Sequence, residues 1–196
     1  MSAAATPAHP IGLVVTDDLR RSRLTVFFRL PLAIPHFLVL YVLGIVMEFV
    51  LFVAWVVAVV LGRLPEGLHN FLGGYMRYLT RVSAYVLLLA DPYPPFAFER
   101  KGYPVEVRVD PPAPENRLTV FFRILLAIPA LLLSAVFRVV NTVMAIFGWF
   151  YCIALGRMHK GMRDVSAWML GYETQTYGYL FLLTSRYPSL AGGPTA

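Results

Sequence analysis

The sequence has little cysteine and little charge, and both shortages exclude classes of protein. Its 196 residues include a single cysteine, Cys152, which excludes an intramolecular disulfide and a cysteine-based metal site. Charged residues make up 14% of the chain, against roughly 25% in soluble domains. Hydrophobic residues make up 58%, and this excess indicates a protein that buries apolar surface in lipid.

The sequence also lacks the short motifs that carry catalysis or cofactor binding. It contains no nucleophile elbow, phosphate loop or dinucleotide-binding turn, and its four histidines are not spaced as metal ligands. We therefore expect no enzyme activity, catalytic residue, cofactor or metal. The net charge of +6 fits contact with anionic lipid better than nucleic-acid binding, because the basic residues flank apolar segments. The first twenty residues lack the apolar core of a removable signal peptide.

A duplication organises the rest of the chain. Residues 23–29, RLTVFFR, recur at 117–123, and the LAIP of 32–35 recurs at 126–129, both at an offset of 94 residues. The same offset pairs Trp55 with Trp149 and Tyr85 with Tyr179. Apolar composition alone does not place arginines, prolines and aromatic residues so consistently, so the chain contains two tandem copies of one unit.

Each copy shows the same three patterns in the same order. A short alternating segment predicts a β-strand, at 11–15 and at 105–109. A long apolar stretch follows, at 30–61 and at 124–155, which we interpret as a transmembrane helical hairpin closed by a tight turn. A stretch with a 3.6-residue apolar period comes last and predicts an amphipathic helix on the cytoplasmic side.

The predicted fold class is a mostly α membrane protein with two tandem repeats and a small β element between them. The predicted boundaries are an N-terminal tail 1–10; a first repeat 11–95 with its hairpin at about 24–62 and its amphipathic helix at about 66–90; a β-hairpin connector 96–104; a second repeat 105–188 with its hairpin at about 118–156 and its amphipathic helix at about 161–184; and a disordered tail 189–196.

The positions of the basic residues predict an orientation. If each apolar stretch returns to its own side, all 17 basic residues except Arg138 lie on one face of the membrane. The positive-inside rule then predicts a multi-pass protein of the cell (inner or plasma) membrane with both termini in the cytoplasm. Each pass of such a hairpin would be short, because a span takes about 20 residues. The hairpins therefore either span the bilayer or wedge into one leaflet.

Four arginines are candidate lipid-headgroup ligands. Arg29 and Arg123 lie beside paired phenylalanines, where a guanidinium can bind a phosphate bidentately, although ordinary interfacial anchoring explains them too. Arg63 and Arg157 follow a Leu-Gly step at the end of each apolar stretch, where they either complete such a site or mark the membrane boundary.

Two ionisable residues interrupt the first apolar stretch. His36 and Glu48 are candidate intramembrane polar residues, because such groups are often functional. Their counterparts in the second copy are Ala130 and Thr142, so a proton relay would belong to one copy only. A solvated position in the hairpin turn is the alternative for Glu48.

The repeated motifs resemble a known family. RLTVFFR with LAIP and His36, followed by GRLP at 62–65 and DPYPPF at 91–96, resembles a bacterial, largely actinobacterial family of multi-pass membrane proteins classed as a domain of unknown function. The resemblance covers nearly the whole chain, once in each half. It implies membrane insertion and no established reaction.

These observations favour a membrane scaffold or accessory protein. Its amphipathic helices and basic residues would engage anionic lipid headgroups or a membrane-protein partner, with a homo-oligomer as another arrangement. The alternative is a small transporter or channel, because internal repeats with sites between them recur in transporters. An enzyme acting on lipids ranks third, since no nucleophile or metal site is present in the sequence.

Overall fold

The computed structural model describes residues 9–99 and 102–191, and within them each copy contributes one strand and three helices. The first copy contains β1 (Ile11–Val15), α1 (Arg23–Phe27), α2 (Arg29–Leu61) and α3 (Glu66–Val86), and the second contains β2 (Val105–Val109), α4 (Arg117–Phe121), α5 (Arg123–Leu155) and α6 (Lys160–Leu180). The mostly helical fold with two repeats and one small sheet agrees with the sequence-based prediction.

The two predicted strands have the predicted bounds and form one antiparallel sheet. Alternate residues of β1 are buried, as expected for a strand with one face on the core. The predicted β-hairpin at 96–104 is wrong for the residues described there, 96–99 and 102–104, which adopt bends and irregular structure. The second strand of the sheet comes instead from the start of the other copy.

The register of the sheet reveals a pseudo-twofold axis. Leu13 pairs with Val107, which is its own counterpart at the offset of 94 residues. Two further hydrogen bonds obey the same symmetry, since Trp55 Nε1 donates to the carbonyl of Val120 and Trp149 Nε1 donates to that of Val26. The two copies are therefore related by rotation about an axis through the centre of the sheet.

The predicted helical hairpins are wrong, because each apolar stretch forms a single helix. α2 and α5 each contain 33 residues, a length of about 50 Å. A hairpin needs turn residues at its centre, and residues 38–52 contain one glycine but no proline, asparagine or aspartate. The helices end where such residues occur, at Gly62 and Gly156, which both adopt the left-handed conformation.

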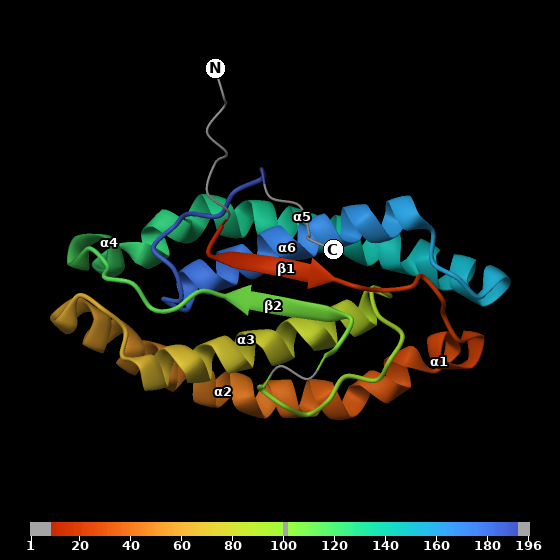
Figure 1. Cartoon of the computed structure of the whole chain (residues 1–196), viewed down its shortest axis with the longest axis horizontal. Helices are drawn as coiled ribbons and strands as arrows, with labels where there is room; N and C mark the ends of the chain where they lie inside the picture. The colour runs from red at the N-terminus through yellow and green to blue at the C-terminus, as the bar shows by residue number, and fades with distance from the viewer. Residues whose placement is uncertain (1–8, 100–101, 192–196) are drawn as a thin grey trace, which may run out of the picture.

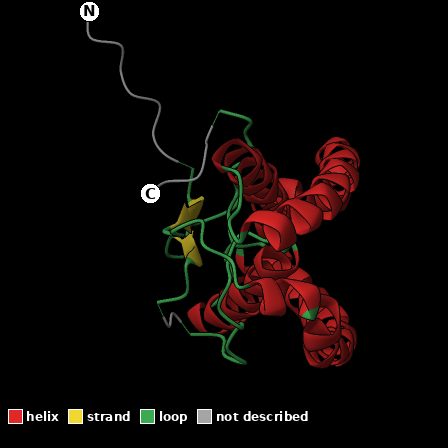
Figure 2. Ribbon diagram, turned by 90° about the vertical axis from the view of Figure 1, so that its right-hand side faces the viewer, coloured by secondary structure: helices red, strands yellow, loops and turns green. Residues whose placement is uncertain are grey.

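The elements form three layers, visible in Figures 1 and 2. The sheet lies on one side, α3 and α6 lie in the middle, and α2 and α5 lie on the far side. α3 packs against β2 and α2, α6 packs against β1 and α5, and α3 and α6 contact each other. The two helices predicted to be amphipathic are therefore the centre of the core, and their apolar faces are covered by protein.

The pseudo-twofold axis makes α2 and α5 antiparallel. The amide of Arg21 bonds to the carbonyl of Gly156 at 3.0 Å and α1 packs against α5, so the segment that leads into α2 lies beside the end of α5. The basic residues that precede and follow α2 consequently lie at opposite ends of the molecule. Without hairpins, the basic residues before and after each long helix are not brought to one end of the molecule. Most of the predicted tails, 1–8 and 192–196, lie outside the described residues.

Candidate functional site

Arg29 and Arg123 are buried and bind groups inside the protein. The Nη1 of Arg29 donates to the carbonyls of Tyr85 and Ala90 at 2.5 and 3.0 Å, and its Nη2 donates to Asp91 at 3.0 Å. Its guanidinium also lies 4.5 Å from the centre of the Tyr85 ring. The side chain fastens the start of α2 to the end of α3 and to the turn that follows it.

Arg123 repeats this arrangement in the second copy. Its Nη1 donates to the carbonyls of Tyr179 and Thr184 at 2.9 and 3.1 Å, and its Nη2 forms an ion pair with Glu115. Burial raises the pKa of the Glu115 carboxyl, while the charge of Arg123 opposes that rise. The internal contacts of Arg29 and Arg123 take the place of the headgroup contact expected from the sequence.

Arg63 and Arg157 are exposed, and each follows the end of a long helix. Because α2 and α5 are antiparallel, these two arginines lie at opposite ends of the molecule. Neither completes a site with the buried arginine of its own copy, since each long helix separates its first residue from its last by about 50 Å.

His36 is buried in an aromatic cluster of the first copy. Its Nδ1 lies 2.7 Å from the hydroxyl of Tyr78, and its ring stacks on Phe96 at 4.1 Å. Burial raises the pKa of Tyr78 to about 12, so the hydroxyl keeps its proton at neutral pH. His36 and Glu48, the two candidate intramembrane polar residues, are separated by 12 residues, about 18 Å along α2, and are not in contact with each other.

Glu48 lies in the middle of α2, and the predicted position in a turn is wrong. It borders a pocket of about 520 Å³ between α2, the start of α5 and the end of α6. We call this the apolar chamber, because most of its lining is hydrophobic: Leu51, Phe52, Trp55, Ile124 and Leu180. The chamber is within the size range of small-molecule sites.

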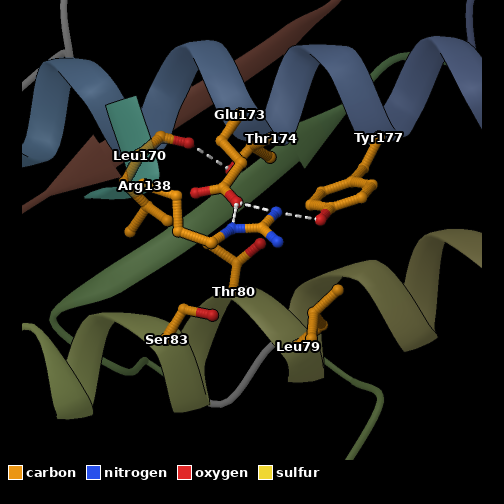
Figure 3. A pocket seen from close by; sticks show the side chains of 8 residues that line it. All are labelled: Leu79, Thr80, Ser83, Arg138, Leu170, Glu173, Thr174 and Tyr177. Atoms are coloured by element: carbon orange, nitrogen blue, oxygen red, sulfur yellow. Dashed lines mark hydrogen bonds and ion pairs between the residues drawn. The ribbon is translucent and has the colours of Figure 1, made fainter. Parts of the chain in front are cut away.

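A second pocket, of about 180 Å³, adjoins the apolar chamber and shares Tyr177 with it. It lies between α3 and α6 on the side away from the sheet, as Figure 3 shows with the strands behind the helices. We call its polar lining the polar floor: Thr80, Ser83, Arg138, Glu173, Thr174 and Tyr177. The two pockets together form what we call the axial groove, because Thr80 and Thr174 are counterparts across the pseudo-twofold axis.

Arg138 is the centre of the polar floor. It is the sixteenth of the 33 residues of α5, and its guanidinium forms an ion pair with Glu173 and a hydrogen bond to the Tyr177 hydroxyl (Figure 3). The side chain of Arg138 remains 56% exposed, whereas that of Glu173 is 12% exposed. The counterpart of Arg138 is Gly44, so this polar group belongs to the second copy alone.

Polar side chains on the two long helices converge on the axial groove. Glu48 borders it from α2, and Arg138 borders it from α5. Thr142 follows Arg138 by one helical turn, so it lies on the same face of α5. An apolar ligand with a polar end would fit such a groove, because its polar end could bind the floor while its apolar part fills the chamber.

Of this site, the sequence predicted only Glu48 as a candidate functional residue. Arg138 stood out only as the one basic residue outside the predicted cytoplasmic face, although a charge at the centre of an apolar helix is a signal for a functional position. Glu173 and Tyr177 were not recognised, because nothing local in α6 shows that they face α5. Among residues 9–99 and 102–191, no three His, Cys, Asp or Glu side chains cluster as metal ligands would.

Comparison with known proteins agrees with the internal duplication. No curated protein and no solved structure matches the chain. The model of the family described as a domain of unknown function, DUF4389, matches residues 23–97 and again residues 117–191. Each match begins at the short helix that precedes a long apolar helix and ends after the helix that packs against it. The chain therefore belongs to the DUF4389 family and contains two tandem copies of its domain.

Proposed function

We propose that this protein is a non-enzymatic membrane scaffold or accessory protein that embeds α2 and α5 in one leaflet of the cell membrane. Both helices are long and apolar enough to cross a membrane. The observation that carries the proposal is where the exposed apolar side chains lie. Among the residues that the structure describes, all but six of the exposed large hydrophobic ones fall within 23–61 and 117–155, and the six are Phe71, Tyr93, Phe96, Val165, Tyr187 and Leu190.

An orientation parallel to the membrane plane is supported by the other two layers. The sheet lies beside the middle of the long helices, and its Arg108–Asp110 pair is about half exposed, at 47% and 50%. Were α2 and α5 to run perpendicular to the membrane, this charged pair and the open sheet edges would lie at the depth of the hydrocarbon. With the helices in the membrane plane, the sheet faces water.

Exposed cations support contact with anionic lipid. They occur at both ends of the long helices, where a helix in the membrane plane brings them to the phosphates: Arg20, Arg23, Arg63, Arg117, Arg157 and Lys160. In this proposal both ends of the molecule and both termini are cytoplasmic. The apolar surface that lipid does not cover is available to a membrane-protein partner or a second copy.

Side-specific labelling tests this orientation. Asp18 precedes α1 and Glu66 begins α3, so a cysteine at either position marks one end of the molecule, and both residues are exposed. The native cysteine is first removed as Cys152→Ala, which copies its counterpart Ala58. In intact cells an impermeant maleimide should label neither position, and permeabilisation should make both reactive. Labelling of one position from outside and the other from inside would refute the one-leaflet orientation.

A small oligomeric transporter or channel is the second candidate. It is supported by the antiparallel relation of the copies and by the Arg138–Glu173 pair between them, since inverted repeats with a polar site at their interface are common in transporters. Reconstituted protein that conducts ions, and loses that conduction on Glu48→Gln, would favour this candidate over the scaffold.

A further inference from the structure

The axial groove contains hydrogen-bonding groups that no other part of the described chain satisfies. Arg138 uses Nε and Nη2 to bind Glu173 and Tyr177, and its Nη1 has no partner among the described residues. Both bonds to Glu173 go to Oε1, which leaves Oε2 for another donor. A ligand that completes the site must therefore accept hydrogen bonds at one atom and donate them at another.

The charge of the groove restricts that ligand further. Arg138 and Glu173 neutralise each other, Arg123 at the border of the apolar chamber is paired with Glu115, and Glu48 adds a negative charge at that border. A purely anionic ligand would add a charge beside two carboxylates, and a purely cationic one would face the Arg138 guanidinium, both in a low-dielectric setting. A zwitterion adds no net charge and can satisfy both groups.

From these contacts we infer that the axial groove binds one zwitterionic phospholipid with a primary ammonium, a phosphatidylethanolamine. Its phosphate accepts from Arg138 Nη1 and from the hydroxyls of Thr80 and Ser83, and its ammonium donates to Glu173. An acyl chain fills the apolar chamber beside Trp55. This inference rests on the proposed function, because the groove opens between two helices that are taken to lie in the leaflet.

The position of the polar floor agrees with the normal orientation of a lipid. The floor lies on the middle layer of helices, which faces the water side in the proposed orientation, and the chamber lies toward α2 and α5. A lipid of the same leaflet would therefore enter headgroup first, with its chains directed to the bilayer centre. No inversion of the lipid is needed.

Native mass spectrometry of the purified full chain tests the inference. Delipidated protein is mixed with equal amounts of palmitoyl-oleoyl phosphatidylethanolamine, phosphatidylcholine and phosphatidylglycerol. We expect one bound phosphatidylethanolamine per chain, preferred at least about tenfold over both other lipids, because phosphatidylcholine lacks N–H donors and phosphatidylglycerol is anionic. Free phosphoethanolamine should not bind, since it has no chain for the chamber. Equal binding of phosphatidylglycerol, or binding of free phosphoethanolamine, would overturn the assignment.

Variants locate the bound lipid in the groove. Arg138→Gln should lower phosphatidylethanolamine binding at least about tenfold, and the double variant Arg138→Gln/Glu173→Gln should do so without leaving an unpaired carboxylate. The exposed Arg108→Gln, on the sheet that faces water in the proposed orientation, is the matched control and should bind like the native chain. Undiminished binding by the double variant would refute the site. If that occurs while labelling still places both ends on the cytoplasmic side, the lipid site alone has failed, and the proposed function stands.

Discussion

Replacing Arg123 separates a structural role from a headgroup role. Arg123→Gln would deprive the carbonyls of Tyr179 and Thr184 of a donor and leave Glu115, whose side chain is 6% exposed, without its cation. Breaking a buried ion pair by removing one partner costs about 3–5 kcal/mol. For a chain of this size, that loss corresponds to a fall in melting temperature of about 6–20 °C.

Thermal unfolding in detergent micelles, followed by circular dichroism, measures this loss. Arg29→Gln should cost less, because its partner Asp91 is 27% exposed and water can replace the lost charge. The exposed Arg63→Gln is the control, with a change within about 0.5 kcal/mol. The penalty of Arg123→Gln should shrink in acid, where Glu115 can take up a proton and no longer needs a cation. An unchanged melting temperature together with weaker lipid binding would refute the internal role of Arg123.

Four further substitutions test the packing between copies and layers and the burial of His69. Gly178→Ala should destabilise the fold by about 1–3 kcal/mol, because the new Cβ would overlap Ile11 Cδ1. Its control is Gly67→Ala, whose Cβ meets nothing within 4 Å and which should stabilise α3. Equal melting temperatures of the two variants would contradict the close contact of α6 with β1. Trp55→Phe should cost about 1 kcal/mol in chemical denaturation, because the indole N–H bonds to Val120 of the other copy, and no loss would contradict that bond. Burial and the charge of Arg77 lower the pKa of His69. The native protein should therefore lose stability as the pH falls below about 6.5, the pKa of histidine in the unfolded chain. In melting experiments His69→Gln should flatten that loss, and an unchanged pH profile would refute the role of His69.

The sequence predicted local features better than long-range ones. The bounds of β1 and β2 follow from alternation within five residues, and the duplication follows from identities at one offset. The pairing of these strands across the two copies could not be predicted, because each strand carries no information about its partner. The predicted hairpins failed because two short helices and one long helix have the same apolar composition, and the single turn-forming residue near each centre, Gly44 in α2 and Asn141 in α5, does not suffice for a hairpin turn.

In the candidate site too, the sequence predicted local features better than long-range contacts. The sequence identified Arg138 and Glu48 as charges within apolar stretches, and both border the axial groove. Arg29 and Arg123 also adjoin apolar stretches and are nevertheless internal, because the carbonyls that they bind lie 56 or more residues away, at and just after the ends of α3 and α6. Whether an arginine near an apolar helix binds protein or lipid depends on those distant carbonyls.

The depth of α2 along its length tests the central claim most directly. Nitroxide labels are placed on single cysteines at Ile34, Ile45 and Phe52, which are exposed by 61%, 59% and 62%, in the Cys152→Ala protein reconstituted in bilayers. The outer two positions are separated by about 27 Å along the helix. Power-saturation measurements with oxygen and a water-soluble nickel chelate should give similar depths at all three, all within one leaflet, with a label at Arg108 in water. Depths that run from one headgroup region through the bilayer centre toward the other would contradict the in-plane helices.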